Sequence, residues 1–203
     1  CRSRREDASR PGAAATALTI AGNELTNPGT TWLAAVHTTV ATTDRQAAEV
    51  KVKNLSSTAF SGPAVRLSAN GNQGYAALAR SGTNEIRLYK INNAMTVLVT
   101  KTLSSSPEGK TIRIEADGST LRVLVDGVVE ITHTDTSYTG PTYRRVGVVS
   151  NGAEADNFYG GDKTVAYVYD KAGNRTKAWA ESFTYDTRNH LATDGTGSYT
   201  WNA

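Results

Sequence analysis

The chain has 203 residues, of which 38% are hydrophobic and 20% charged, with a net charge of +3 and a single cysteine. This length suits one large or two small domains, and one cysteine excludes an internal disulfide and a cysteine-based metal site. The excess positive charge lies mainly in residues 1–10 and no apolar stretch approaches the roughly 20 residues of a membrane-spanning helix, so we expect neither a nucleic-acid-binding nor a membrane-spanning protein.

The front of the chain precedes the first expected strand. Residues 1–14 are charged and then rich in proline, glycine and alanine, which predicts a flexible leader. Because the chain begins with Cys1 rather than methionine, we expect a processed chain or a fragment of a longer one. From residue 15 onward Thr, Val, Ser and Gly are frequent and helix-favouring windows are scarce, which favours an all-β domain.

Short runs of strand-forming residues follow one another along this domain. Asn70-Gly71-Asn72 predicts a hairpin turn between two of them, and the spacing of about 8–12 residues indicates an antiparallel β-sandwich or barrel. The clearest pattern is 111–134, where Asp117-Gly118 and Asp126-Gly127 separate three alternating runs, which predicts a three-stranded meander. Further strands are expected over 17–21, 32–42, 48–55, 64–69, 74–80, 85–91, 96–103, 145–150 and 154–159.

The pattern changes after Gly160-Gly161-Asp162. Tyr167-Val168-Tyr169-Asp170 returns 16 positions later as Phe183-Thr184-Tyr185-Asp186, and Tyr199-Thr200-Trp201 follows after the same interval. Aromatic pairs of this kind are typical of strands, and a fixed period indicates a stacking array of hairpins. We therefore expect 15–162 to be one domain and 163–203 to be the truncated beginning of an array.

This tail resembles the YD (Rhs) repeat, with the pattern Tyr-x-Tyr-Asp-x-x-Gly-Asn-Arg-Leu. The resemblance implies short β-hairpins of a spiralling shell that can enclose a C-terminal toxin or effector, in a secreted or cell-surface bacterial protein. Aspartates beside such turns are expected to accept hydrogen bonds from turn amides. Thr176 and His190 depart from the pattern. The matching residues are Tyr167, Tyr169, Asp170, Gly173, Asn174 and Arg175, then Tyr185 and Asp186 in the second unit.

Residues 15–162 resemble a concanavalin A-like jelly roll of the LamG or laminarinase type. The segments that carry the resemblance are GPAVRLSANGNQGYAAL, IRIEADGSTLRVLVDGVVE and RRVGVVSNGAEADNFYGGD. It implies two antiparallel sheets, with glycans binding on a concave face or a loop rim, and in many members a structural calcium ion. A likeness of fold alone says little about function.

Glycan binding needs aromatic rings that stack on sugars and planar polar side chains that bond their hydroxyls. Arg66, Tyr75 and Tyr89 are the hypothesised sugar contacts, with Arg66 and Tyr75 on adjacent arms of one hairpin. The alternative is that these tyrosines fill the core. Asp156 is the hypothesised ligand for Ca²⁺, because calcium takes oxygen ligands, and its alternative role is to cap a turn.

Catalysis is not expected. Retaining glycoside hydrolysis needs two carboxylates about 5–5.5 Å apart, whereas the strands considered offer one acid each beside basic residues, and Arg113 and Glu115 are interpreted as a solvated ion pair. We hypothesise a non-catalytic module that binds a glycan or a cell-wall polysaccharide at the front of a secreted or cell-surface Rhs protein. A structural plug or spacer of the shell without a ligand is the alternative, and a glycoside hydrolase ranks third.

Overall fold

The computed structural model of the chain comprises two compact units, Cys1–Lys163 and Thr164–Ala203. None of the described residues belongs to a helix long and apolar enough to cross a membrane. The residues that the structure describes are 19–21, 24–26, 32–38, 40–55, 59–163, 167–169, 174–178, 181–182, 184–186, 188, 190–193 and 198–200.

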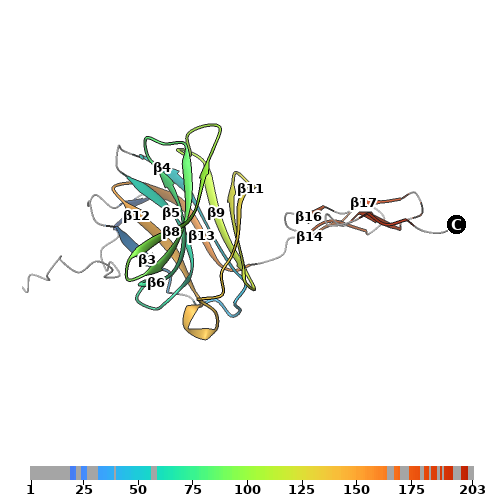
Figure 1. Cartoon of the computed structure of the whole chain (residues 1–203), viewed down its shortest axis with the longest axis horizontal. Helices are drawn as coiled ribbons and strands as arrows, with labels where there is room; N and C mark the ends of the chain where they lie inside the picture. The colour runs from blue at the N-terminus through green and yellow to red at the C-terminus, as the bar shows by residue number, and fades with distance from the viewer. Residues whose placement is uncertain are drawn as a thin grey trace, which may run out of the picture. The chain divides into compact units, whose positions relative to one another are not determined.

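Two antiparallel sheets form the first unit (Figure 1). One has seven strands in the order β1-β2-β13-β4-β9-β10-β11, and the other has six in the order β3-β12-β5-β6-β7-β8. The seven-stranded sheet contains β1 (Thr19–Ala21), β2 (Glu24–Thr26), β4 (Gln46–Lys53), β9 (Thr111–Asp117), β10 (Thr120–Val125), β11 (Val128–Thr134) and β13 (Glu154–Asp162). The six-stranded sheet contains β3 (Leu33–Val36), β5 (Phe60–Leu67), β6 (Gln73–Arg80), β7 (Glu85–Asn92), β8 (Met95–Thr102) and β12 (Arg145–Asn151). A single 3₁₀ turn, Pro141–Tyr143, precedes β12.

The predicted meander is confirmed by β9, β10 and β11, which pair in sequence order. Asp126 and Gly127 have φ values of 48° and 82°, and Gly118 has 56°, so both Asp-Gly turns use the left-handed conformations that tight hairpins require. The predicted hairpin of β5 and β6 is also confirmed, with Val65 paired to Tyr75. Local turn chemistry and alternation were sufficient to predict these pairs.

The core lies between the two sheets. Ile112 and Ile114 of β9 face Leu88 and Val65 from the other sheet within one fully buried apolar cluster. Removing such side chains from water is the main driving force for this fold, with roughly 1.5–3 kcal/mol for each large aliphatic side chain. A second buried cluster, which includes Leu78, covers the opposite face of the six-stranded sheet, so β5 and β6 are buried on both faces.

The expected strand over 32–42 is confirmed only for β3, Leu33–Val36. Beyond it the chain still follows β12, because the His37 amide donates to the Val146 carbonyl and the Ala41 amide donates to the Arg144 carbonyl. The sequence did not predict β2, a strand of three residues. Short edge strands carry too few residues for alternation to be recognised.

The described residues of the second unit include several short antiparallel strands. Its three-stranded sheet contains β14 (Tyr167–Tyr169), β15 (Arg175–Ala178) and β16 (Glu181–Ser182), and its two-stranded sheet contains β17 (Thr184–Tyr185) and β18 (Leu191–Thr193). Asp170 and Gly173 of the YD pattern lie outside the described residues. The Asp186 Oδ1 atom accepts bonds from the amides of Arg188 at 2.8 Å and His190 at 2.9 Å, the turn role expected of it.

Candidate functional site

Strand β9 carries charged side chains on the face of the seven-stranded sheet that points away from the core. Ile112 and Ile114 are in the core between the sheets. Because successive residues of a strand point to opposite faces, Arg113, Glu115 and Asp117 lie on the outer face. The local sequence Arg-Ile-Glu-Ala-Asp therefore provides one apolar and one ionised face.

Strand pairing extends this outer face across the sheet in rows. Gly161 of β13, Ala47 of β4 and Glu115 of β9 are successive partners in one row. The row continues through Arg122 of β10 to Thr132 of β11. The small residues at positions 47 and 161 leave the charged side chains of β9 and β10 as the bulky groups of this row.

The neighbouring row supplies an aromatic ring. Tyr159 of β13 is paired with Glu49 of β4, which in turn is paired with Arg113 of β9. The Tyr159 side chain is 50% exposed. The outer face thus presents one accessible phenol ring on the same surface as several planar charged groups.

A pocket of about 190 Å³ opens on this face at the end of the β9–β10 hairpin. We call it the β9–β10 pocket. Its lining is strongly polar, with two carboxylates, a hydroxyl, a guanidinium and an ammonium group. The lining residues are Glu115, Asp117, Thr120, Arg122 and Lys163.

Both carboxylates of the β9–β10 pocket are paired. Glu115 Oε1 lies 2.9 Å from Arg113 Nε, and its Oε2 lies 3.2 Å from Lys163 Nζ in an ion pair that lacks hydrogen-bond geometry. Lys163 Nζ also lies 3.3 Å from Asp117 Oδ2, which is 3.0 Å from Arg45 Nη2. The predicted Arg113–Glu115 pair therefore exists, but it is not solvated, because Glu115 is only 1% exposed beneath the cations.

Glu115 and Asp117 bring two carboxylates to one face of β9, although the Asp117-Gly118 pattern by itself indicates only a turn. A glycosidase acid must keep its proton near neutral pH, which requires a raised pKa. Partial burial alone would raise the pKa of Asp117, but hydrogen bonds from Arg45 and Lys163 outweigh it and hold the pKa below its usual value. The lowered pKa keeps Asp117 ionised near neutral pH, so Asp117 does not meet this requirement of a general acid.

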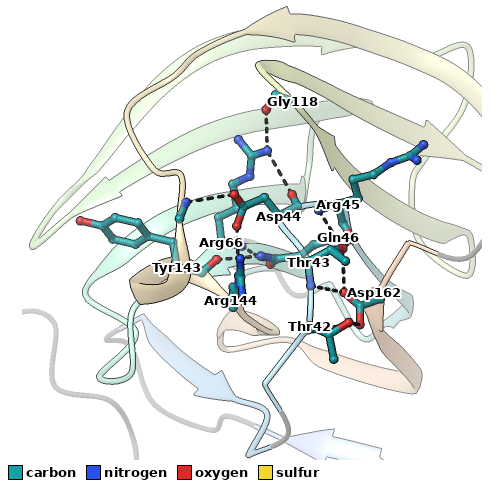
Figure 2. Close-up of polar contacts among 11 residues, drawn as sticks. Thr42, Thr43, Asp44, Arg45, Gln46, Arg66, Gly118, Tyr143, Arg144 and Asp162 are labelled. Carbon is teal, nitrogen blue, oxygen red and sulfur yellow. Dashed lines mark hydrogen bonds and ion pairs between the residues drawn. The ribbon is translucent and has the colours of Figure 1, made fainter.

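Polar contacts join residues 42–45 to the end of β13, next to the pocket residue Lys163 (Figure 2). The Asp162 carboxylate accepts the amides of Thr42 and Thr43 at 2.9 and 2.8 Å, together with both of their hydroxyls. The Lys163 amide donates to the Arg45 carbonyl at 2.7 Å. These bonds fix the backbone next to Arg45 and Lys163, whose side chains pair with Asp117.

Arg66 is buried next to residues 42–45 and is not exposed on a surface. Its Nη2 donates to the carbonyls of Asp44 and Gly118, and its amide donates to Gln46 Oε1 at 2.8 Å (Figure 2). The side chain is 1% exposed, and burial lowers the pKa of its guanidinium. Its φ of 52° is uncommon for a non-glycine residue. Arg66 thus joins the start of β4 to the β9–β10 turn.

The two predicted tyrosine contacts are also buried. Tyr75 is fully buried in the core, its hydroxyl donates to Asp135 Oδ1 at 2.6 Å, and its ring contacts Tyr138. Tyr89 is 8% exposed and belongs to the second apolar cluster. Sugar contact at Arg66, Tyr75 and Tyr89 stays a prediction, but none of the three offers an open ring or donor, and the structure does not bring them to a common surface.

Asp156, the hypothesised calcium ligand, has partners within the protein. Its Oδ2 lies 2.9 Å from Lys53 Nζ, and its Oδ1 accepts the Asn157 amide at 2.7 Å. The hydrogen bond from Lys53 lowers the pKa of the Asp156 carboxyl. Among the described residues, no three His, Cys, Asp or Glu side chains gather into a group that could hold a metal ion. Calcium binding at Asp156 remains a prediction.

Neither a protein-family model nor a curated protein matches the sequence. Among solved structures, the chain is similar to the carbohydrate-binding module CBM66 from Bacillus subtilis, with 16% identity, 72% of this chain and 87% of that chain covered, and a TM-score of 0.53. It is also similar to toad ovary galectin in complex with thio-digalactose, with 12% identity, 64% of this chain and 97% of that chain covered, and a TM-score of 0.46. A functionally unknown protein from Saccharomyces cerevisiae is similar as well, with 12% identity, 75% of this chain and 95% of that chain covered, and a TM-score of 0.48. The likeness to the module shows the fold: the first unit is an antiparallel β-sandwich of the jelly-roll kind, as the sequence predicted.

Proposed function

We propose that the first unit is a non-catalytic carbohydrate-binding module and that its ligand site is the outer face around the β9–β10 pocket. The observation that carries this proposal is the pocket itself, a polar depression whose carboxylates are already neutralised by cations. The fold shared with a carbohydrate-binding module supports it. By itself a shared fold would not specify a function.

The chemistry of this face suits a sugar. Sugars are bound by planar side chains that hydrogen-bond their hydroxyls and by aromatic rings that stack on their C–H faces. The pocket offers the guanidinium of Arg122 and the hydroxyl of Thr120, and the neighbouring row offers the ring of Tyr159. Tyr159 on β13 and Arg122 on β10 are three strands apart, roughly 14 Å at about 4.8 Å per strand, and lie on neighbouring rows, so an extended saccharide of several residues is needed to contact both.

The setting of the module is also part of the proposal. The tail carries the YD pattern, and its described residues form short antiparallel strands, which supports a place at the front of an Rhs/YD-repeat shell. Such a protein would be secreted or held at the cell surface, where a cell-wall polysaccharide or a host glycan is available to bind. The remainder of the shell would then be the partner of residues 163–203.

A glycan array probed with the full chain, once with Ca²⁺ and once with chelator, tests the proposal. We expect saturable binding that chelator does not change, because the pocket relies on ion pairs and side-chain donors. The variant Tyr159→Ala should weaken binding about 5- to 10-fold through the loss of stacking. Tyr199→Ala removes a ring of comparable exposure, 43%, from the second unit and should have no effect. Absence of binding to every saccharide would leave the structural plug or spacer as the better explanation.

A further inference from the structure

Arg122 differs from the other charged residues of the β9–β10 pocket. Arg113, Lys163 and Arg45 each contact a carboxylate. Arg122 lines the same pocket, yet its guanidinium has no hydrogen-bond or ion-pair partner among the residues that the structure describes. Its partner across the strands is Glu115, whose two oxygens are already held by Arg113 and Lys163.

The ion pairs around the pocket do not include Arg122. Three carboxylates lie on this part of the outer face, on Glu49, Glu115 and Asp117, and each is in an ion pair. Four cations accompany them, and Arg122 is the one that forms no ion pair with these carboxylates. The four cations are Arg45, Arg113, Arg122 and Lys163.

We propose that the β9–β10 pocket selects an anionic sugar, whose carboxylate or sulfate group pairs with Arg122; this inference rests on the proposed carbohydrate-binding function. A guanidinium presents parallel N–H donors that match a carboxylate or sulfate in a two-bond arrangement. Thr120 is on the same face, two positions before Arg122, and its hydroxyl adds a donor of neutral character. The Asp117 carboxylate, whose side chain is 35% exposed, can accept bonds from the hydroxyls of the same sugar.

Matched saccharides test this selectivity. The full chain is titrated by calorimetry with tetragalacturonate, with its carboxyl-reduced neutral counterpart, with a sulfated galactan oligosaccharide, and with inorganic sulfate alone. We expect the neutral oligosaccharide to bind about 10- to 100-fold more weakly than tetragalacturonate, because it lacks the charge-assisted bonds. The sulfated oligosaccharide distinguishes a sulfate preference from a carboxylate preference, and the free ion tests whether the sugar is needed.

Two variants of Arg122 and one control variant test whether Arg122 binds the anionic group. Arg122→Gln should reduce binding of the anionic oligosaccharides about 10- to 100-fold and weaken binding of the neutral one by a clearly smaller factor, because the neutral sugar loses only uncharged hydrogen bonds. Arg122→Lys keeps the charge but loses the two-bond geometry, so its affinity for the anionic oligosaccharides should lie between those of the unchanged protein and of Arg122→Gln. Arg80→Gln removes the same charge from the six-stranded sheet, and its affinity for the anionic oligosaccharides should stay within about 2-fold of that of the unchanged protein. The thermal midpoint of each variant reports whether it is folded.

The outcomes separate the two levels of the proposal. Equal binding of tetragalacturonate and its neutral counterpart would overturn the anion selectivity while leaving carbohydrate binding intact. Anionic binding that Arg122→Gln and Arg122→Lys both leave unchanged would overturn the assignment to the pocket. Binding of inorganic sulfate as tightly as the oligosaccharides would also overturn it, because the site would then recognise an ion and not a sugar. No binding of any saccharide would remove the proposed function itself.

Discussion

Substitution of Lys163 by methionine should destabilise the first unit considerably. The Lys163 side chain is 4% exposed, and its Nζ lies 3.2 Å from Glu115 Oε2 and 3.3 Å from Asp117 Oδ2. Breaking a buried ion pair leaves a charge without compensation and commonly costs about 3–5 kcal/mol. Since Arg113 still holds the other oxygen of Glu115 at 2.9 Å, we expect about 2–3 kcal/mol.

A double-mutant cycle with Glu115→Gln measures the pair directly. The amide carries no charge, so Glu115→Gln should relieve part of the cost of Lys163→Met, with a coupling energy of about 1–2 kcal/mol. Urea unfolding of the full chain, followed by the methyl resonances of Ile112 and Ile114, reports on the core of the first unit. Strict additivity, or a loss below about 0.5 kcal/mol for Lys163→Met, would refute the reasoning that this network is buried.

An exposed pair provides the control. Lys101 lies 3.5 Å from Glu130, and its side chain is 47% exposed. Exposed pairs contribute about 0–1 kcal/mol, so Lys101→Met should change the free energy of unfolding by less than about 0.5 kcal/mol. A loss as large as that of Lys163→Met would indicate that the aliphatic stem, not the charge, supplies the stabilisation.

Three further predictions concern other parts of the sandwich. Partial burial would raise the pKa of Asp162, but the bonds from Thr42 and Thr43 lower it to about 2 from 3.8. The stabilisation from Asp162 is therefore present above about pH 4 and is lost as the pH falls towards 2, by about 1 kcal/mol after allowance for solvent exposure. Asp162→Asn should abolish this part of the pH dependence of the urea midpoint. Tyr75→Phe removes the donor to Asp135 and should cost about 1 kcal/mol in the same assay. Gly147→Ala would place a Cβ 1.9 Å from the Ala35 carbonyl oxygen, so it should abolish soluble expression or lower the free energy of unfolding by about 3 kcal/mol or more. In the control Gly82→Ala the new Cβ meets nothing within 4 Å, and the positive φ should cost only about 1 kcal/mol.

The strands were predictable where the signal is local. Alternation and Asp-Gly turns are properties of neighbouring residues, and they predicted the meander 111–134 and the hairpin of β5 and β6. The pairings of β13 with β4 and of β4 with β9 join segments that are far apart in the sequence. One sequence contains no local signal for such registers, so the position of Lys163 in the β9–β10 pocket could not be predicted, whereas the other four lining residues lie on the predicted meander.

The burial of the hypothesised sugar contacts has a different cause. Arg66 and Tyr75 belong to β5 and β6, in which nearly every residue is buried. Apolar residues continue through AVRLSA and GYAALA without regular alternation, and such near-continuous runs indicate burial on both faces. This signal was available, and it argued against an exposed tyrosine at position 75. The acid pair in Glu115-Ala116-Asp117 was equally available from its spacing of two residues.

The bonds around Asp162 have a mechanical consequence. A pulling force on the chain beyond Lys163 reaches the sandwich through this residue, where the Lys163 amide is bonded to the Arg45 carbonyl and the preceding carboxylate is bonded to Thr42 and Thr43. The load is therefore shared by several bonds at the attachment point before the ladder between β13 and β4 is strained. Under such a force we expect the bonds at Asp162 and Lys163 to break before the core of the first unit is exposed.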